Sequence, residues 1–414
     1  MRVSRRSMIS IAVFLGVAAL IVAGWTLETQ RAGHESLSNT ITLSVTNGAD
    51  RGPGTLREAL FVAATAPGPV RISLQVPRIS LTTALPPIVS SHEVRISAGQ
   101  GGSEIDATAL GGGSPVLDVA AANVSLQGVA ISHCANDAIL VRAVHFSLER
   151  ATIDACDVGV DVAENAHDLL LENNRFVNDR VGIKFAGPSA DTTVASNQFA
   201  GNKDAGVWAV RGGADQQGGT ISVRANHFDR GRSAIVAGNI KVVIEQNDIT
   251  GTQGAAVDLV GGGAVVRGNR VSNGAGMGIL AEGARAPVVE SNELNALAAY
   301  GIMIRGSSNA LVRANRVYNC AYGMAFVLGD ARNPSTVVDN IIMEPRYDGI
   351  DVVGDTPILR QNHVLKPRAF ALRVQDFDRP DGSTVRGAPF LDHNSFGPPS
   401  ATPVAGRPAG TSLQ

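Results

Sequence analysis

The chain has 414 residues, of which 44% are hydrophobic, only 4% are aromatic and 46 are glycine. Its 35 Lys and Arg nearly balance its 37 Asp and Glu, so no basic surplus favours a nucleic-acid partner. The 3 cysteines lack zinc-type spacing, and their small number in a chain of this length excludes a disulfide-dense mini-domain. Glycines without a period of three exclude collagen. We therefore predict a long, turn-rich β protein with an aliphatic core, no metal site and no cofactor.

Residues 1–30 are expected to be a signal for export. Arg2, Arg5 and Arg6 precede an uncharged, mostly apolar run from Met8 to Trp25. This run is at the lower limit of a membrane span and longer than most signal-peptide cores, so a signal anchor and a cleaved signal peptide both remain open. Positive charge before the run leaves the N-terminus in the cytoplasm. The rest of the chain is then predicted to be periplasmic, membrane-anchored at the inner membrane, or secreted.

A short amphipathic helix is predicted soon after this segment. Thr55 and Glu58 have the spacing of a capping box, in which the two side chains bond reciprocally to backbone amides. The apolar residues that follow share one helical face: Leu56, Ala59, Leu60 and Ala63. Such a helix would cover the open end of a repeat structure.

A six-residue phrase recurs from the middle of the chain almost to its end, with asparagine in its fourth position. Successive copies, such as those around Asn269 and Asn292, are about 22 residues apart. The asparagines are Asn174, Asn197, Asn226, Asn247, Asn269, Asn292, Asn315, Asn340 and Asn362. We attribute their recurrence to tolerance of left-handed backbone at a bend and to a ladder of amides bonding from coil to coil.

A second phrase, a small residue followed by an aliphatic one, comes shortly after most of these asparagines. Clear copies are Gly206-Val207 and Gly301-Ile302, and apolar residues around them alternate with a period of two, as in Ile302-x-Ile304. A repeat of this length is too short for two helices. Each period is therefore predicted to be one coil of short strands, stacked on the next coil at ~4.8 Å in a parallel solenoid.

These phrases at this period resemble the right-handed parallel β-helix repeats of the pectate-lyase-like superfamily, and residues 52–60 resemble the segment that opens many such solenoids. The resemblance implies an all-β, single-stranded right-handed parallel β-helix over residues 31–396, with a short N-terminal capping helix and a C-terminal cap. Residues 397–414 are predicted to be a disordered Pro/Gly-rich tail. The superfamily's catalytic signatures, such as Asp-Pro-His-Asp of mannuronan C5-epimerases, are missing, so no catalytic residue transfers by position.

Outward positions of stacked coils form rows whose charges alternate in sign. One row reads Arg224, Glu245, Arg267, Glu290 and Arg313; a second reads His227, Asp248, Arg270, Glu293 and Arg316; a third reads Asp157, Arg180, Asp204 and Arg232. Opposite charges on neighbouring strands favour pairing, so we interpret these rows as structural. The same register pairs Asp161 with Lys184, which argues against a calcium site among the nearby aspartates.

Two cysteines occupy equivalent positions one coil apart. Cys134 and Cys156 should have Cα atoms ~4.8 Å apart, within disulfide range. The interpretation we favour is a small buried side chain filling a turn, as for Cys320 in the same slot further along. A catalytic cysteine is not expected, because no histidine is placed to activate it.

The C-terminal coils break the charge pattern and supply the candidate site. All 4 tyrosines of the chain fall within three coils, close to two arginines and two aspartates. The candidate catalytic residues are Tyr300, Arg305, Tyr322, Arg346, Asp348 and Asp351. Aromatic faces stack on sugars, arginine pairs with uronate carboxylates, and Tyr or Asp can move a proton. The structural alternative is a tyrosine stack that seals the edge of the core.

Two functional hypotheses follow for a monomer whose partner is an acidic polysaccharide. The first is a polysaccharide lyase or C5-epimerase, in which Tyr300 or Tyr322, tuned by Asp348 or Asp351, transfers the C5 proton while Arg305 or Arg346 neutralises the carboxylate. The second is a non-catalytic polysaccharide-binding protein or cell-envelope assembly scaffold. A third, weaker one resembles the β-helix maturation factor of nitrous oxide reductase, which the few His and Cys residues disfavour.

Overall fold

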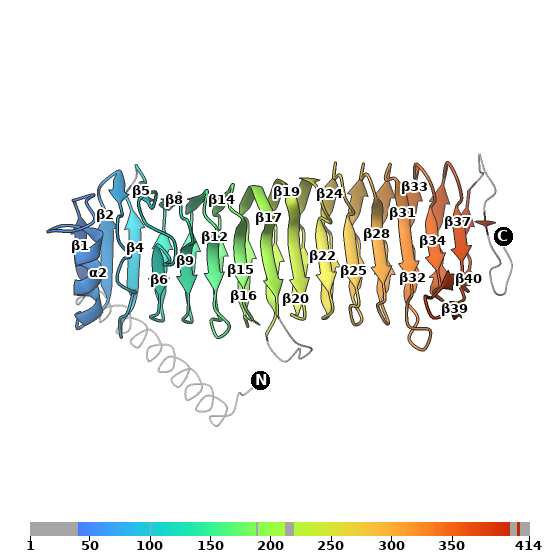
Figure 1. The fold of residues 1–414 in the computed structure, drawn as a ribbon, viewed down its shortest axis with the longest axis horizontal. Helices are drawn as coiled ribbons and strands as arrows, with labels where there is room; N and C mark the ends of the chain where they lie inside the picture. Colours follow the sequence, from blue (N-terminus) through green and yellow to red (C-terminus); the bar gives the residue numbers. More distant parts are fainter. Residues whose placement is uncertain (1–39, 100, 188, 212–218, 398–403, 406–414) are drawn as a thin grey trace, which may run out of the picture.

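The computed structural model describes residues 40–99, 101–187, 189–211, 219–397 and 404–405, which stack into one long parallel β-solenoid (Figure 1). The predicted fold class is confirmed. The predicted export segment, residues 1–30, and most of the predicted tail, residues 397–414, lie outside the described residues. Within the described part, no helix has both the length and the apolar character that a membrane span requires.

Each coil places one strand on each of three faces. The first face is a 15-stranded parallel sheet. Its strands are β1 Ile41–Val45, β2 Val70–Leu74, β4 Val94–Ala98, β7 Val124–Gln127, β10 Ser147–Glu149, β13 Leu170–Glu172, β16 Thr192–Ala195, β18 Ile221–Arg224, β20 Val242–Glu245, β23 Ala264–Arg267, β26 Val288–Glu290, β29 Leu311–Arg313, β32 Thr336–Val338, β35 Ile358–Arg360 and β40 Phe390–Asp392.

The second and third faces form one 25-stranded sheet, because two long strands run across both. These strands are β17 Gln198–Val210 and β19 His227–Gly238. The second face also contains β3 Arg78–Ser80, β5 Ser103–Asp106, β8 Val129–Ser132, β11 Thr152–Asp154, β14 Arg175–Val177, β21 Asp248–Thr252, β24 Arg270–Ser272, β27 Glu293–Asn295, β30 Arg316–Tyr318, β33 Ile341–Met343, β36 His363–Leu365 and β41 Ser395–Phe396.

The third face carries the candidate site. Besides β17 and β19 it contains β6 Leu117–Val119, β9 Asp137–Val141, β12 Val158–Val162, β15 Val181–Phe185, β22 Val257–Val260, β25 Ile279–Glu282, β28 Tyr300–Arg305, β31 Tyr322–Val327, β34 Ile350–Val353, β37 Leu372–Gln375 and β42 Val404–Ala405. A small antiparallel hairpin of β38 Phe377–Asp378 and β39 Thr384–Val385 follows β37.

The asparagine ladder lies at the bend between the first and second faces, and its hydrogen bonds confirm the predicted amide stacking. Asn269 Nδ2 donates to Asn292 Oδ1 at 3.0 Å, and Asn269 Oδ1 accepts from both the backbone N–H and the Nδ2 of Asn247. The ladder runs from Asn174 to Asn362 and ends on Asn394, which the repeat count missed.

The prediction that the ladder asparagines themselves adopt left-handed backbone at the bend is wrong. The ladder asparagines do not have positive φ; the residue before each one does, as with Ala314 at 53° before Asn315 and Gly268 at 61° before Asn269. The sharp bend therefore comes from the preceding left-handed residue. Asparagine is required by its position inside the bend, where it is about 1% exposed and must satisfy buried backbone groups.

The core is aliphatic, with a short stack of phenylalanines on the second face. Phe176, Phe199 and Phe228 stack from coil to coil with ring centroids 5.0 and 4.6 Å apart. This packing explains the glycine of the second phrase. A Cβ on Gly206 would lie 2.6 Å from the Phe228 ring, so only glycine lets the third face pack this closely.

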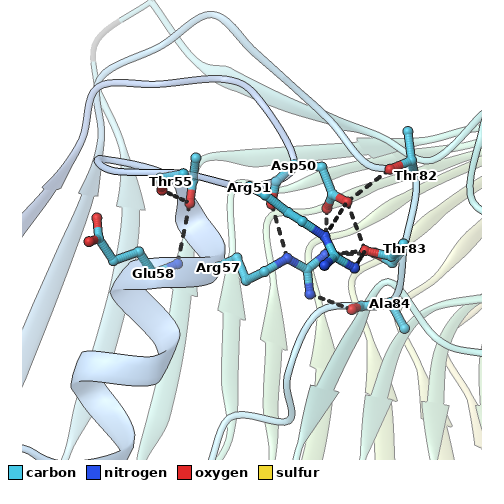
Figure 2. A network of polar contacts seen from close by, with 9 residues as sticks. Asp50, Arg51, Thr55, Arg57, Glu58, Thr82, Thr83 and Ala84 are labelled. Atoms are coloured by element: carbon cyan, nitrogen blue, oxygen red, sulfur yellow. Dashed lines mark hydrogen bonds and ion pairs between the residues drawn. The ribbon is translucent and has the colours of Figure 1, made fainter.

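The predicted capping helix is α2, Leu56–Thr65, which lies at the N-terminal end of the solenoid (Figure 1). Thr55 accepts a hydrogen bond from Glu58 N, and the four predicted apolar residues are buried. Figure 2 shows how the helix is attached: the Arg57 guanidinium donates to the Asp50 carboxylate and to the backbone carbonyls of Thr83 and Ala84. Burial would raise the Asp50 pKa, but the hydrogen bonds from Arg57, Thr83 and Thr82 outweigh it and lower that pKa.

The alternating rows form ion pairs, as predicted, although not at every step. Arg267 pairs with Glu245 at 2.6 Å, and Arg180 bridges Asp157 and Asp204. Lys184 pairs with Asp161 at 2.9 Å. Cys134 and Cys156 form a disulfide, so the interpretation of both as free buried thiols is wrong, whereas Cys320 is free and buried. The half-cystine Cα atoms are 4.3 Å apart because the two residues stack on adjacent coils.

Candidate functional site

Four successive coils of the third face, at β28, β31, β34 and β37, bring the candidate residues together near the C-terminal end (Figure 1). Tyr300 begins β28 and Tyr322 begins β31, and the register places them directly opposite each other. Their rings stack with centroids 4.5 Å apart, and Tyr347 extends the stack at 4.9 Å from Tyr322. Tyr318 is not part of it, because it ends β30 on the second face.

The tyrosine stack lies beside a buried carboxyl group. Asp351 is 5% exposed, on β34, and its Oδ2 accepts a hydrogen bond from the Tyr300 hydroxyl at 2.8 Å. The coil between them contributes only Ala325 at the equivalent outward position. Asp351 Oδ1 is buried and accepts no hydrogen bond from any described residue. One oxygen of this carboxyl is thus held by the tyrosine, and in its protonated form the carboxyl also hydrogen-bonds to the neighbouring Asp348.

A second carboxyl adjoins it and is fully engaged. Asp348 is 2% exposed; its Oδ1 accepts from the backbone N–H of Phe370 at 3.0 Å and its Oδ2 from Arg373 at 3.2 Å. Arg373 is the in-register neighbour of Asp351 on β37 and also lies 5.9 Å from the centre of the Phe370 ring. Asp348 is therefore fixed in place by a cation and a backbone amide.

Burial raises the pKa of Asp351 to about 7, and the negative charge of Asp348 acts in the same direction, while the hydrogen bond from Tyr300 opposes both. Burial also raises the pKa of Tyr300, helped by the charges of Asp351 and Asp348. Tyr300 therefore keeps its proton near neutral pH, whereas the pKa of Asp351 lies close to neutral pH.

The two predicted arginines occupy different places. Arg346 is exposed beside the stack and donates one hydrogen bond, at 2.8 Å, to the carbonyl of Leu297. Arg305 pairs with its in-register neighbour Glu282 at 3.5 Å, with both side chains exposed. Arg305 thus belongs to an exposed ion pair and forms no hydrogen bond or ion pair with the other candidates, because it lies at the opposite end of β28 from Tyr300.

Sequence reasoning missed Arg373 and Phe370 and left Tyr347 out of the candidate set. Arg373 follows Asp351 by one coil in the same row, so extending the register one coil further would have found it. Cys320 is close to the cluster, but burial raises its thiol pKa to about 11, which leaves it unreactive near neutral pH. Among the residues that the structure describes, no three His, Cys, Asp or Glu side chains gather as a metal site would require.

Comparison with known proteins places the fold in a family. The family model described as right handed beta helix region matches residues 88–217 and 213–364. Similar solved structures include the Dettilon tailspike protein (13% identity, 80% of this chain and 68% of that chain, TM-score 0.52). A second is the catalytic unit of a thermostable GH87 alpha-1,3-glucanase from Streptomyces thermodiastaticus strain HF3-3 (15% identity, 86% of this chain and 68% of that chain, TM-score 0.49). A third is the mannuronan C-5 epimerase AlgE6 A-module from Azotobacter vinelandii (13% identity, 86% of this chain and 100% of that chain, TM-score 0.46).

At these identities the structural likeness concerns the fold alone. A comparison with curated proteins finds no match. The expected resemblance to right-handed β-helix repeat proteins is confirmed, and what the third face does has to be argued from its own residues.

Proposed function

This chain belongs to the right-handed β-helix family, and we propose that it is an exported protein that binds or acts on an acidic polysaccharide along its third face. The observation that carries the proposal is the three-tyrosine stack beside an almost buried carboxyl pair, Asp348 and Asp351. Two of the similar folds, a glucanase and a mannuronan epimerase, carry names that refer to polysaccharides.

Each part of the cluster has a task on a uronate chain. The exposed ring of Tyr347 offers an apolar face to a sugar ring, and Arg346 offers guanidinium N–H groups to a carboxylate. The ionised form of Asp351 can accept the proton at C5 of the uronate, because its pKa is about 7.

The reaction that fits best is removal of that proton with the carboxylate charge neutralised by Arg346. In a lyase the C5–H electron pair forms the C4=C5 double bond, the C4–O bond breaks, and the leaving oxygen takes a proton. The Tyr322 hydroxyl can supply this proton, since no described residue holds it in a hydrogen bond. In a C5-epimerase the C4–O bond stays intact, and the Tyr322 hydroxyl instead returns a proton to C5 from the face opposite Asp351.

Binding without turnover is the second candidate, and a specific observation favours it. Asp348 and Asp351 are 2% and 5% exposed, and three of their four oxygens already accept hydrogen bonds from the fold. A carboxyl pair so well covered also fits a structural role beneath a polysaccharide-binding surface, in a cell-envelope assembly scaffold.

The test compares the double variant Tyr322→Phe, Arg346→Ala with Arg267→Ala, Glu290→Ala, which removes two members of an ion-pair row on the first face. The protein is assayed on polygalacturonate, polymannuronate and polyguluronate for binding, for new unsaturated ends and for a changed epimer ratio. We expect the tyrosine–arginine variant to lose binding or turnover with an unchanged circular dichroism spectrum, and the control to behave as wild type.

Two results would contradict this assignment, and a third would decide between its two candidates. Equal loss in the control places the polysaccharide elsewhere. Unfolding of the tyrosine–arginine variant supports the stack as a seal of the core. Binding that depends on the cluster, without new ends or epimers on any polymer, selects the non-catalytic candidate.

Export is part of the same proposal. The Cys134–Cys156 disulfide supports it, because disulfides persist in oxidising compartments. In spheroplasts of an expressing bacterium, external protease should digest the solenoid. A reporter fused after Gln414 that is active in the cytoplasm would contradict export.

A further inference from the structure

The third face carries one continuous outward row in which the candidate cluster is only the C-terminal part. The register connects eight outward positions on consecutive strands from β17 to β37: Trp208, Val236, Asp258, Leu280, Met303, Ala325, Asp351 and Arg373. At ~4.8 Å per coil, Asp258 is ~19 Å from Asp351 along the solenoid. The three positions between them are uncharged, in contrast to Asp161 and Lys184, which form an ion pair earlier in the same row.

A pocket opens at the N-terminal part of this row. It has a volume of about 230 Å³ and is lined by Asp204, Trp208, Arg232, Ser233, Val236 and Asp258. Trp208 is half-buried, so part of its ring forms the wall of the pocket. An aromatic wall together with a carboxylate and a guanidinium is a combination that recognises sugars.

Of the three charged residues that line this pocket, Asp204 pairs with Arg180, whereas Asp258 and Arg232 form no ion pair with any described residue. Asp258 faces Val236 and Leu280 in its row, and its buried Oδ1 accepts no hydrogen bond from a described residue. Burial raises the pKa of Asp258, the charge of Glu282 raises it further, and Arg232 lowers it. Because Asp258 Oδ1 accepts no hydrogen bond from a described residue, it is available to accept one from a ligand hydroxyl.

Arg232 is the last residue of the alternating row that begins at Asp157, and no residue of that row is available to pair with it. Arg180 already pairs with both Asp157 and Asp204, and the next coil presents Gly254 beside Arg232. The Arg232 side chain is exposed and forms no ion pair with any described residue. Its guanidinium is therefore free to pair with an anionic group outside the protein.

We propose that this pocket is a second sugar-binding subsite, which takes a carboxylated sugar unit of the same polysaccharide chain. The proposal rests on the proposed function. Trp208 contacts the face of the sugar ring, Arg232 pairs with its carboxylate, and Asp258 accepts hydrogen bonds from its hydroxyls. The polysaccharide then runs parallel to the solenoid axis, over Leu280 and Met303, to the cluster around Asp351.

The chain offers a direct probe of this subsite. It has 2 tryptophans, Trp25 and Trp208, so Trp25→Phe leaves Trp208 as the only tryptophan, and its emission can be excited selectively over that of the 4 tyrosines. Its emission is followed during titration with oligogalacturonates and oligomannuronates, short and long. Neutral maltooligosaccharides of matched length serve as the ligand control. We expect a shift or quench with at least one acidic series and none with the neutral one.

Two variants in the Trp25→Phe background separate the subsites. Arg232→Gln should raise the Kd obtained from the Trp208 emission about tenfold or more, which is the effect of losing one hydrogen bond to a charged group. Tyr322→Phe with Arg346→Ala should keep the response to short oligouronates but abolish the tighter binding of oligomers long enough to span both subsites. Arg267→Gln, on the first face, should change neither.

The outcomes distinguish the two proposals. Polyuronate binding that needs Tyr322 and Arg346 but leaves Trp208 emission unchanged overturns the subsite and keeps the proposed function. A Trp208 response that needs Arg232 but not the cluster keeps the subsite and overturns the role of the cluster. No binding of any acidic probe overturns both. A response of equal size to maltooligosaccharides overturns recognition of the carboxylate.

Discussion

Substitution of one ladder asparagine tests what holds the coils together. In Asn269→Leu the side chain loses the oxygen that accepts the backbone N–H of Asn247 at 3.0 Å and its Nδ2 at 2.9 Å. Both donors are buried and have no water to replace the lost partner, since Asn247 and Asn269 are each 1% exposed. Each unpaired buried donor costs ~1–3 kcal/mol, so we expect a loss of about 2–6 kcal/mol in the free energy of unfolding.

The matched control is Asn295→Leu, on the strand that follows Asn292. The Asn295 side chain points outward and takes part in one long hydrogen bond, at 3.5 Å, from Asn319. Its replacement should change stability by no more than ~0.5 kcal/mol, the usual range for surface positions. Both variants introduce the same leucine, so the difference between them reports the ladder.

The measurement is urea unfolding followed by circular dichroism, together with hydrogen exchange at the Asn247 amide. Exchange matters because a solenoid can open locally without unfolding throughout. We expect a lower urea midpoint and faster exchange at Asn247 in Asn269→Leu. An unchanged midpoint with unchanged protection of that amide would refute the reasoning, because it would mean that the ladder hydrogen bonds contribute nothing that leucine packing does not replace.

Two further predictions concern the left-handed bend and the buried carboxyl. In the same urea assay, Ala314→Gly should raise stability by about 0.5–1 kcal/mol and Gly268→Ala should lower it by about 1 kcal/mol, because both residues have positive φ. A steric clash does not explain the second effect, since the nearest neighbour to a Cβ on Gly268 is 3.9 Å away. Changes of the opposite sign would exclude backbone strain at this bend position. The pKa of Asp351 is raised to about 7, above ~3.9 in the unfolded chain, so the folded state binds more protons between these values and its stability falls as pH rises through that window. Asp351→Asn should remove this fall and become stabilising relative to wild type above pH ~7; parallel stability curves for the two proteins from pH ~5 to ~8 would contradict the buried, proton-binding carboxyl.

The sequence by itself was sufficient for the fold, for the helix cap and for the rows beside the asparagine bend. The bend between the first and second faces is two residues long in nearly every coil, as in Ala225-Asn226. Strand positions on either side of it therefore keep a constant offset from the asparagine. Pairs such as Arg267 with Glu245 can then be read by counting residues, because a constant turn transmits register from coil to coil.

Only the tertiary structure decided which residues share the third face. The turns before it vary in length, and the pairing of β17 with β19 contains a register shift between Asn202 and Ala205. Val236 therefore lies 10 residues after its ladder asparagine, whereas Trp208 and Asp258 lie 11 residues after theirs, so a constant count breaks at that coil of the row. The contact of Tyr300 with Asp351 crosses two coils, and burial, which has no sequence signature of its own, raises the pKa of that carboxyl. Periodicity specifies a stack of coils, but chemistry on its surface depends on register, turn length and solvent exclusion, which are properties of the folded chain.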